Sequence, residues 1–579
     1  MPPATLSRVR TTASVADADA RGAVSNWNFA DIFEAVAAAV PQAPAQVCGQ
    51  RRFNWSQFDR RSDALAASLL AASLGDQAKV AAYLYNGPEY LETYFAAFKA
   101  GLVPVNTNFR YGPDEIRYLF DDADAEAVVF HSSFGPLLEK VRNRLPKVKA
   151  WFAVNDAAPV PSWALDYETI VGTEIAAALS IGAEPTGDHV RAPWGRSGDQ
   201  LILVYTGGTT GMPKGVMWRQ DDLFNVMGSG GNPRLGVGPA TSVEELADRV
   251  TGPGAVLLPA CPLMHGTGQF TALVTLALGG CIVTLANRAF QPDELFETVE
   301  RERVNSLVIV GDAFAKPMLA SLVAGSSKRD LSSLSTITSS GVMWSQESKD
   351  AMLGHLPEIS LVDNYGSSEA GSLGASVSTK GNAANTASFQ RKPTVHVFTD
   401  DDRRIEPGSN EAGFVAISGF VPLGYYKDPQ KSARTFRTIN GVRYCVPGDY
   451  ANVLADGSLH LLGRGSVCIN TGGEKVFPEE VEEILKQHPS VLDAVCVGVP
   501  DERFGEVICA LIESTLAGDP PEPTLLIEHV RGRLARYKAP RHVLTVESIG
   551  RSPAGKVDYK RLRDLAIDRL GRGTRTNQG

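Results

Sequence analysis

The stretch Leu201-Ile202-Leu203-Val204-Tyr205-Thr206-Gly207-Gly208-Thr209-Thr210-Gly211-Met212-Pro213-Lys214 decides how this chain folds and what it can bind. Its first five residues form an apolar run, which predicts a buried strand. In the loop that follows, glycines let backbone N–H groups point together at one anion, threonine hydroxyls add donors, and Lys214 adds a positive charge. Met212-Pro213 stiffens the turn. The pattern predicts a phosphate-binding loop, because a solvated surface loop would need none of these matched features.

Neither this loop nor a second Gly-Lys segment is a Walker A motif. Lys214 follows proline and precedes glycine, which departs from that motif. The segment from Gly550 to Lys556 has the G-x-x-x-x-G-K spacing, but Val557 stands where a Ser or Thr would hold magnesium. No strand–loop–helix pattern surrounds it. The sequence therefore argues against a P-loop NTPase.

Outward from the loop, helical and strand patterns alternate over about the first 450 residues. The helical segments are 65–72 and 90–100, and the apolar runs are 80–85, 127–130, 201–205, 282–285 and 306–309. Such alternation predicts parallel sheets covered by helices. Between residues 395 and 450 the pattern changes to strands and turns, with turn signals at Pro407-Gly408, Asn440-Gly441 and Asp456-Gly457.

After Gly463 the pattern restarts as a compact α+β unit with a helix at 478–487, a strand at 491–499 and a helix at 525–534. The predicted class is α/β: a large N-terminal domain of parallel and mixed sheets flanked by helices, a β-subdomain, and a small mobile α+β C-terminal domain. The expected boundaries are a flexible arm at 1–25, the N-terminal domain at 26–464, a hinge at 465–466, a C-terminal lid domain at 467–570 and a flexible tail at 571–579.

Bulk properties narrow the class of protein. A chain of 579 residues needs more than one core, and 44% hydrophobic with 21% charged residues is typical of globular proteins. The net charge of −9 argues against a nucleic-acid partner. Seven scattered cysteines without a C-x-x-C pair fit neither a disulfide framework nor a zinc site. Residues 1–22 lack the apolar core of a secretory signal, and 270–286 predicts a buried helix and strand, not a transmembrane segment. We expect a cytoplasmic protein, peripheral to the membrane at most.

Residues 205–216 closely resemble the signature of the adenylate-forming (ANL) superfamily, which contains acyl-CoA synthetases, peptide-synthetase adenylation domains and firefly luciferase. Further motifs of that superfamily follow in the right order over roughly residues 28–565. They are Leu263-Met264-His265-Gly266, Asn364-Tyr365-Gly366-Ser367-Ser368-Glu369, Gly448-Asp449, Gly463-Arg464, the segment from Gly472 to Glu482, and Pro553-Ala554-Gly555-Lys556.

The resemblance implies that the N-terminal domain holds ATP and the acid. Its ATP/AMP-binding residues would be Thr206, Gly207, Gly208, Thr209, Thr210, Gly211, Lys214, Ser340, Gly341, Asn364, Tyr365, Gly366, Ser367, Ser368, Asp449, Arg464 and Lys556. Tyr365 would stack on adenine, Asp449 would accept hydrogen bonds from the ribose, and Arg464 would steady ribose or phosphate. Glu369 would be the metal ligand, because Mg²⁺ prefers carboxylate and phosphate oxygens.

The catalytic positions implied by the resemblance are Lys556, Glu369, His265 and Thr206. Lys556 would contact the attacking carboxylate and the α-phosphate, where negative charge develops. His265 would be an aromatic gate beside the carboxylate. For the second half-reaction the small domain would rotate, and Gly472, Gly473 and Glu474 would line the tunnel for coenzyme A. Many relatives carry a charged residue at the hinge; here Gly465-Ser466-Val467 replaces it, so Gly465 or Ser466 is the expected pivot.

Four strings resemble actinobacterial acyl-CoA synthetases that activate steroid side-chain carboxylates: 216–219, 424–428, 435–444 and 463–476. The candidate acyl-pocket residues are His265, Gly266, Thr267, Gly268, Gln269, Gly311, Asp312, Met343 and Trp344. A sterol needs a wide apolar cavity, which glycines would leave open, although they equally suit tight packing. Asp312 is better explained as a helix cap. Residues 228–254 are interpreted as a loop insertion that could act as a lid.

The predicted function is an acid–CoA ligase that uses Mg-ATP to make acyl-AMP and pyrophosphate and then transfers the acyl group to CoA. A bulky steroid side-chain acid is the preferred substrate, and a medium- or long-chain fatty acid is the alternative. An acyl-AMP ligase that loads a carrier protein is disfavoured by the complete Gly472-Gly473 loop. A silent binding relative is disfavoured by intact Lys214, Glu369, Asp449 and Lys556. A homodimer is common in the superfamily, and nothing in the sequence fixes one.

Overall fold

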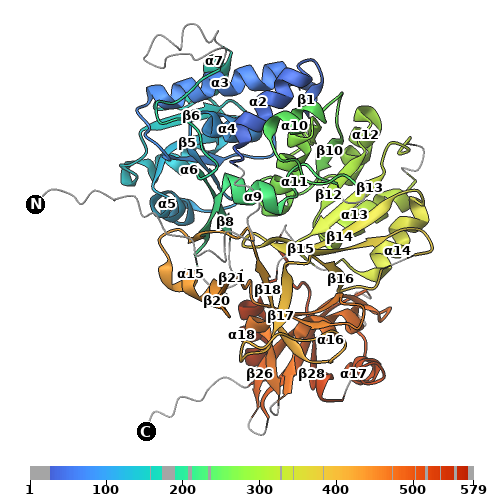
Figure 1. The fold of residues 1–579 in the computed structure, drawn as a ribbon. Coiled ribbons are helices and arrows are strands. Elements are labelled where there is room, and N and C mark those ends of the chain that lie inside the picture. The colour runs from blue at the N-terminus through green and yellow to red at the C-terminus, as the bar shows by residue number, and fades with distance from the viewer. Residues whose placement is uncertain are drawn as a thin grey trace, which may run out of the picture.

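The computed structural model describes residues 26–156, 158–172, 189–206, 212–232, 236–325, 329–342, 344–382, 384–471, 474–501, 504–515, 520–534, 536–552 and 557–571. In these ranges the chain forms three sheets with helices packed on them (Figure 1). Two large sheets and their helices make up the upper part of the view, and a small C-terminal unit lies below them. The predicted α/β class with a small α+β unit at the C-terminus is confirmed.

An eight-stranded sheet contains Leu201–Thr206 and Lys214–Arg219, the strands on either side of the predicted phosphate loop. Its order is β19-β9-β8-β4-β3-β5-β6-β7, and the strands from β8 to β7 are parallel. The bounds are β3 Lys79–Tyr83, β4 Val103–Asn106, β5 Ala125–His131, β6 Ala150–Val154, β7 Leu165–Asp166, β8 Leu201–Thr206, β9 Lys214–Arg219 and β19 Gly424–Tyr425. The apolar runs at 80–85, 127–130 and 201–205 are all strands here, as predicted.

The largest sheet has a parallel half and an antiparallel half. The parallel half runs in the order β1-β11-β10-β12-β13-β14, and β2 flanks it at the outer edge. Its bounds are β1 Pro44–Cys48, β2 Arg51–Asn54, β10 Val256–Pro259, β11 Cys281–Thr284, β12 Ser306–Ile309, β13 Thr336–Ser340 and β14 Ser360–Ser367.

The antiparallel half is the predicted strand-and-turn region. It contains β15 Gly371–Ser378, β16 Ser388–Arg391, β17 Val395–Phe398, β18 Ala412–Ser418, β20 Phe436–Ile439, β21 Val442–Cys445, β22 Asp449–Val453 and β23 Leu459–Arg464. Asn440 and Gly441 form the two-residue turn between β20 and β21, with φ of +49° and +81°. Two positive φ angles are the requirement of a type I′ hairpin, which explains why Asn-Gly stands there.

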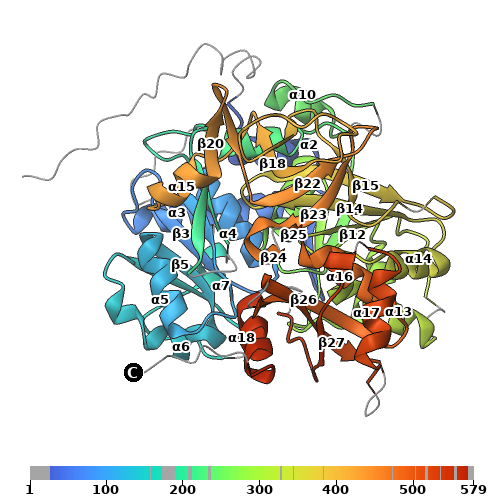
Figure 2. The same ribbon diagram turned by 90° about the horizontal axis from the view of Figure 1, so that it is seen from below.

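The C-terminal unit has its own sheet, which contains β24 Ile469–Thr471, β25 Glu474–Val476, β26 Val491–Asp501, β27 Gly505–Ser514 and β28 His542–Thr545. Helices α16 Pro478–Lys486, α17 Pro523–Arg531 and α18 Tyr559–Arg569 pack on it. Seen from below, this unit lies beside the β22–β23 end of the large sheet (Figure 2). Helix α16 packs against β23, and Lys316 donates a 3.1 Å hydrogen bond to the carbonyl of Leu492.

A main buried core and a smaller second one lie against the two large sheets, and both are covered by helices. The helices are α2 Phe29–Ala39, α3 Trp55–Ala71, α4 Pro88–Lys99, α5 Pro113–Asp122, α6 Gly135–Glu139, α7 Tyr167–Val171, α9 Gln220–Val226, α10 Val243–Asp248, α11 Gly266–Ala277, α12 Pro292–Glu302, α13 Asp312–Val323, α14 Gln346–His355 and α15 Pro429–Thr435. Phe33 of α2 and Phe95 of α4 pack edge to face in the main core, with ring centroids 5.3 Å apart. Aromatic pairs of this kind add to the burial energy of the rings themselves.

Two segments need comment. Residues 270–286 lie in buried helix α11 and strand β11, as expected, and within the described ranges no helix has the length and apolar character of a membrane crossing. The expectation of a plain loop at 228–254 is wrong. This segment contains helix α10, which packs on α2 and buries Leu246 completely, so hydrophobic burial anchors it. The seven cysteines all lie in the described ranges, and none of them forms a disulfide bond there.

Candidate functional site

The β8–β9 hairpin holds the two ends of the predicted phosphate loop side by side. Thr206, the last residue of β8, pairs with Lys214, the first residue of β9. Gly207, Gly208, Thr209, Thr210 and Gly211 lie outside the described residues. Opposite residues of an antiparallel pair lie within about 5.5 Å of each other. Thr206 and Lys214 therefore lie side by side at the base of the predicted phosphate loop.

Lys214 is held by groups that the sequence analysis did not single out. Its ammonium lies 3.4 Å from Asp428 Oδ2. Burial alone would lower the pKa of Lys214, but hydrogen bonding to Tyr118 and the charge of Asp428 raise it. The amine is therefore protonated at neutral pH and half-buried, ready to pair with an anion that reaches the loop. Asp428 belongs to the string 424–428, which the sequence associates with the choice of acid substrate through its resemblance to steroid-activating enzymes. In the structure, Asp428 instead contacts Lys214.

The adjacent strands β13 and β14 bring together the residues predicted to surround adenine. Ser340 and Asn364 are direct partners in this parallel pair. The Asn364 side chain donates to Ser340 Oγ at 3.5 Å and accepts from Ser372 Oγ at 2.6 Å, which fixes its amide. Gly341 has a φ of +97°, a backbone conformation that side chains rarely adopt. The chain can therefore turn away at the end of β13 and leave its edge open.

Tyr365, Asp449 and Arg464 form one polar group, although they come from three strands. The Tyr365 hydroxyl donates to Asp449 Oδ2 at 3.1 Å, and Arg464 Nε lies 3.3 Å from Asp449 Oδ1. Asp449 is buried, and burial raises its pKa, while Arg464 and the Tyr365 hydroxyl oppose that change. The Tyr365 ring is also buried and packs at 5.4 Å on Phe389. The arrangement presents a carboxylate, a guanidinium and an aromatic ring within one small region.

Glu369 lies in the turn between β14 and β15, directly after Ser368, whereas Gly366 and Ser367 are the last two residues of β14. Glu369 accepts a 2.8 Å hydrogen bond from the hydroxyl of Tyr425, the last residue of β19. The carbonyl of Ser368 accepts a 2.8 Å bond from the indole of the fully buried Trp218 on β9. Both contacts connect this turn to the hairpin that carries Thr206 and Lys214. The structure therefore brings the predicted metal ligand to the phosphate side of the site.

The N-terminus of α11 points at the same region. His265 is the residue that precedes the helix, and a Cβ placed on Gly266 would lie 3.5 Å from Ser368 Oγ. A Cβ on Gly341 would lie 3.7 Å from Oγ1 of Thr267. His265, Gly266 and Thr267 therefore lie between the Ser368 turn and the end of β13, where an acid would have to meet the nucleotide.

Other predicted pocket residues are engaged in packing. A Cβ on Gly268 would come within 2.8 Å of the Pro262 carbonyl, so a glycine is needed for close approach. Gln269 is fully buried and donates to the hydroxyl of Tyr90 at 3.2 Å. Trp344 is also fully buried, and Met343 lies outside the described residues.

The helix-cap interpretation of Asp312 is wrong in detail. Helix α13 begins at Asp312 itself, and Gly311, with a φ of +51°, occupies the capping position. The Asp312 carboxylate instead accepts bonds from the backbone N–H and hydroxyl of Ser345, at 3.2 and 3.1 Å. Because Ser345 caps α14, Asp312 connects the starts of two neighbouring helices.

At the junction with the C-terminal unit, the glycine with an unusual backbone is Gly463, with a φ of +126°. A Cβ there would collide with the carboxylate of Glu479 on α16. Gly465 is required for a different reason, because a Cβ on it would lie 2.6 Å from the Tyr450 ring. Gly472, Gly473 and Lys556 lie outside the described residues, and Glu474 begins β25.

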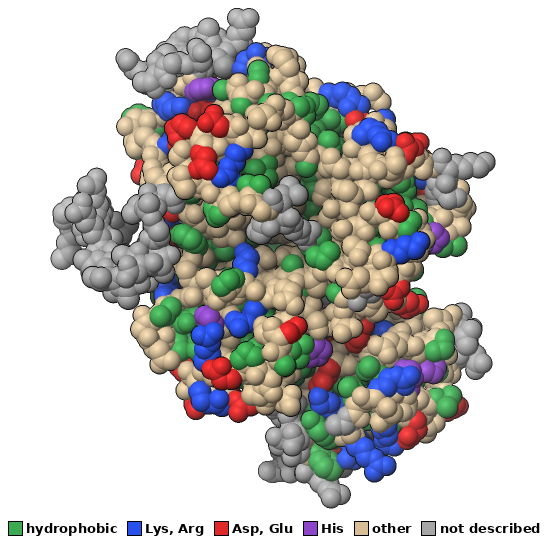
Figure 3. Space-filling model, turned by 45° about the vertical axis from the view of Figure 1, so that its right-hand side comes forward, with side chains coloured by type: hydrophobic (Ala, Val, Ile, Leu, Met, Phe, Trp, Pro, Cys, Tyr) green, Lys and Arg blue, Asp and Glu red, His purple; other side chains and the backbone are tan. Residues whose placement is uncertain are grey.

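The C-terminal unit contains a cavity of about 480 Å³. It is lined by three arginines, an exposed tyrosine and apolar side chains: Thr471, Phe504, Val507, Ile508, Ile527, Arg531, Arg536, Tyr537, Ala539, Pro540 and Arg541. Lys and Arg side chains gather at the lower end of the face in Figure 3, where this unit lies. Thr471, which lines the cavity, directly precedes the predicted CoA-side residues in the sequence. The sequence analysis did not identify it.

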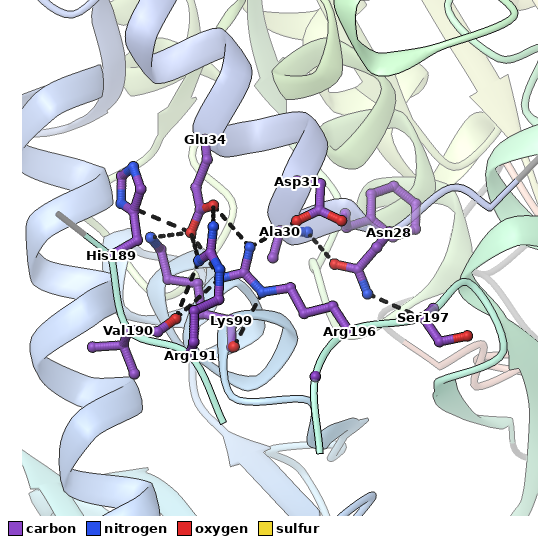
Figure 4. A network of polar contacts seen from close by, with 12 residues as sticks. Asn28, Ala30, Asp31, Glu34, Lys99, His189, Val190, Arg191, Arg196 and Ser197 are labelled. Atoms are coloured by element: carbon purple, nitrogen blue, oxygen red, sulfur yellow. Dashed lines mark hydrogen bonds and ion pairs between the residues drawn. The ribbon is translucent and has the colours of Figure 1, made fainter. Parts of the chain in front are cut away.

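A cluster of titratable side chains elsewhere resembles a metal site by distance alone. One ligand atom each from Glu34, Asp63 and His189 lies within 4.8 Å of the others. However, the Lys99 ammonium already lies 2.9 Å from both carboxylates. Figure 4 shows Glu34 on α2 facing Lys99, Arg191, Arg196 and His189. The cation of this cluster is the lysine, and its function is to hold α2, α3 and α4 to the segment after residue 188.

Two family models match this chain. The model described as AMP-binding enzyme matches residues 33–426, and the model described as AMP-binding enzyme C-terminal domain matches residues 480–556. The chain is 40% identical over 548 residues to a medium/long-chain-fatty-acid–CoA/3-oxocholest-4-en-26-oate–CoA ligase of Mycolicibacterium smegmatis, with 94% of this chain and 97% of the relative covered.

A second relative is the 3-oxocholest-4-en-26-oate–CoA ligase of Rhodococcus rhodochrous. It is 39% identical over 546 residues, which cover 93% of this chain and 95% of the relative. Among solved structures, the anthranilate CoA ligase AuaEII in complex with anthranoyl-AMP matches with a TM-score of 0.78 at 21% identity, covering 95% of this chain and 99% of that chain. At that identity the likeness shows the shared fold.

Proposed function

This chain belongs to the AMP-binding enzyme family, and we propose that it is an acid–CoA ligase whose acid is a steroid side-chain carboxylate. The enzyme class is that of an AMP-forming acyl-CoA synthetase, with ATP and CoA as co-substrates. The observation that best supports the catalytic site is that one short segment holds both Lys214, through Asp428, and Glu369, through Tyr425. Asp449 is held by Tyr365, which lies in the strand that leads to Glu369.

In the first half-reaction a carboxylate oxygen of the acid attacks the α-phosphorus of ATP, and pyrophosphate leaves. We assign the departing phosphates to Thr206, Lys214 and the loop between them. Lys556 would stabilise charge on the attacking carboxylate and the α-phosphate. His265, before α11, would border the acid. These roles make chemical sense because negative charge develops on the attacking carboxylate and the phosphates, and cationic and hydroxyl donors stabilise it.

The nucleoside is assigned to the group formed by Tyr365, Asp449 and Arg464. Asp449 is a buried acceptor with two oxygens, and ribose offers two hydroxyl donors. Tyr365 already engages one of these oxygens, which orients the carboxylate. Ser340, Gly341 and Asn364 would form the edge that adenine meets.

A magnesium ion fits beside Glu369. Mg²⁺ commonly uses one or two protein carboxylates and completes its shell with water and substrate phosphates. Glu369 supplies one carboxylate at the end of β14, and the Tyr425 hydroxyl orients it at 2.8 Å. When bound, the ion would neutralise charge on the phosphates of ATP. Glu369 is the single protein ligand that we assign.

In the second half-reaction the thiolate sulfur of CoA attacks the acyl carbon and AMP leaves. We propose that residues 465–466 are the hinge about which residues 467–570 rotate, and that Gly472, Gly473 and Glu474 then line the thiol's path. The cavity beside Thr471 would take the anionic nucleotide end of CoA, because Arg531, Arg536 and Arg541 offer complementary charge. A carrier-protein acceptor is disfavoured by this built-in site.

The acid is the least constrained partner. Two relatives are named for 3-oxocholest-4-en-26-oate, and one of them is also named for medium- and long-chain fatty acids. A medium- or long-chain fatty acid is therefore the second candidate. The test is the rate of thioester formation, followed by mass spectrometry, with steroid side-chain acids and with straight-chain acids at equal concentration. Faster turnover of the linear acids would reject the steroid assignment, and pyrophosphate release without any thioester would reject the ligase.

A further inference from the structure

One buried asparagine, Asn106, bonds both Tyr205, at the base of the predicted phosphate loop, and Met264. Asn106, the last residue of β4, is 3% exposed. Its Nδ2 donates to the carbonyl of Tyr205 at 2.9 Å and to the carbonyl of Met264 at 2.6 Å, and its Oδ1 accepts from the N–H of Tyr205 at 2.6 Å. Tyr205 directly precedes Thr206, and Met264 directly precedes His265.

The two segments belong to different sheets, and the Asn106 amide bonds both of them directly. Tyr205 belongs to the eight-stranded sheet, whereas Met264 lies in the loop that follows β10 of the large sheet. Strands β4 and β8 pair through Val105 and Leu203, and the Asn106 amide extends that ladder by one step by bonding both polar groups of Tyr205. Because one planar amide holds three backbone groups, a shift of either segment would break at least one bond.

A second asparagine provides a natural comparison. Asn86, in the connection between β3 and α4, donates to the carbonyl of Cys261 at 3.0 Å and accepts from the N–H of Leu263 at 2.8 Å. It therefore holds the same loop before His265. Among the described residues, its hydrogen bonds reach only the segment from Pro259 to Leu263 and not β8 or β9. Asn86 therefore holds only the loop before His265, which we assign to the acid. Asn106 holds that loop and also Tyr205, which precedes the predicted phosphate loop.

We propose that Asn106 is a positioning residue that sets the separation between the acid carboxylate and the ATP phosphates. The inference rests on the proposed function and names a residue that does not itself touch either substrate. Reacting groups must be held close to their productive geometry, and a misplacement of about 1 Å costs roughly a hundredfold in rate. Because one side chain bonds both Tyr205 and Met264, it keeps the phosphate-binding segment and the acid-binding segment at a fixed separation.

A simpler role would be to satisfy buried backbone groups, which any fold must do. That role predicts a loss of thermal stability with unchanged substrate constants. Positioning predicts a specific pattern in the KM values. The experiment compares Asn106→Ala with Asn86→Ala in the full chain, using acid-dependent ATP–pyrophosphate exchange with the acid that the wild type turns over fastest in the substrate panel, and melting temperature in parallel.

We expect Asn106→Ala to lower kcat by roughly a hundredfold, and to raise the KM for ATP and the KM for the acid each by about tenfold. Asn86→Ala should raise the KM for the acid and leave the KM for ATP within about twofold. The proposal is overturned if Asn106→Ala leaves the KM for ATP unchanged, or if the two variants give the same pattern.

If Asn106→Ala does not fold, Asn106→Ser is measured instead, because a serine hydroxyl can keep one of the three hydrogen bonds. It should show a smaller rise in the same two constants, and unchanged constants would overturn the proposal. Wild-type protein that shows no acid-dependent exchange would reject the proposed function instead, so the two failures are distinguishable.

Discussion

The hydroxyl of Tyr425 donates a 2.8 Å hydrogen bond to Oε1 of Glu369, which lies 56 positions earlier in the chain. Tyr425 is buried at the end of β19, where it pairs with Val216 of β9. The contact therefore joins the predicted metal ligand to the hairpin of the phosphate loop. A carboxylate held in one orientation binds a metal better than one that rotates freely.

Replacing this hydroxyl should weaken magnesium binding without removing the ligand. We expect Tyr425→Phe to raise the magnesium concentration needed for half-maximal pyrophosphate release by about tenfold. The matched control is Tyr426→Phe, because the Tyr426 hydroxyl also donates to a carboxylate at 2.8 Å, but to Asp124. An equal shift in both variants would show that the effect comes from folding and not from Glu369.

The basic cavity of the C-terminal unit should affect CoA and not ATP. Arg536→Ala and Arg541→Ala should each raise the KM for CoA by about tenfold, because each removes a cation from the cavity lining. Salt should reduce the difference from wild type, since part of the attraction is screened. Acid-dependent pyrophosphate exchange should stay at the wild-type rate. Arg533→Ala is the control, because Arg533 contacts His529 and is absent from the lining. A similar rise with Arg533→Ala would contradict the assignment.

The assigned role of Lys556 predicts a split between the two half-reactions. Lys556→Ala should slow acyl-adenylate formation by a factor of about 10² to 10³, as expected for the loss of one donor to developing charge. Thioester formation from supplied acyl-AMP and CoA should survive. Lys560→Ala, an exposed lysine at the start of α18, should leave both steps intact. Equal losses in both steps for Lys556→Ala would remove its assignment to adenylation.

Glu479 predicts a pH dependence at the junction of the two units. Its carboxyl is buried against Gly463, and Oε2 finds no hydrogen-bond partner among the described residues. Burial, together with the charge of Glu482, raises the pKa of Glu479 well above its ordinary value of 4.5. The observed packing therefore favours the protonated acid. Its stabilising contribution is fully present below pH 4.5 and is lost as the pH rises through the raised pKa.

Glu479→Gln keeps the shape and stays neutral at every pH. We expect its melting temperature to exceed that of the wild type at alkaline pH, with a gap that narrows toward pH 5. Differential scanning calorimetry between pH 5 and pH 9 measures this directly. Parallel curves for the two proteins would show that folding does not raise the pKa of Glu479.

Much of the fold was predictable because local patterns agree with the tertiary arrangement. The run at 306–309 is strand β12 with the same bounds, and helix α16 starts at Pro478 as expected. The end of α17 was misjudged by three residues, since apolar periodicity continues past Arg531 where the helix stops. Helix α10 was missed because its six residues, with a single buried leucine, are too short to show a period.

The site was predictable where a motif is contiguous and unpredictable where partners are distant. Asn364, Tyr365 and Glu369 lie in one string, and their strand brings them into one region. Tyr425 and Asp428 belong to a string whose contacts with Glu369 and Lys214 no spacing rule reveals. Asn106 lies beside Thr107 in an ordinary polar stretch, and its proposed role follows from three hydrogen bonds to distant segments of the chain.

The sequence by itself determined that a glycine- and threonine-rich loop with Lys214 follows a buried strand, and it predicts that this loop binds phosphate. It did so because backbone freedom, hydroxyl donors and charge are properties of the residues themselves. Only the tertiary structure decided which groups hold that loop in register with the rest of the site. Asn106, Tyr425 and Asp428 act through hydrogen bonds and ion pairs over long sequence separations, and such contacts exist only once the sheets have packed.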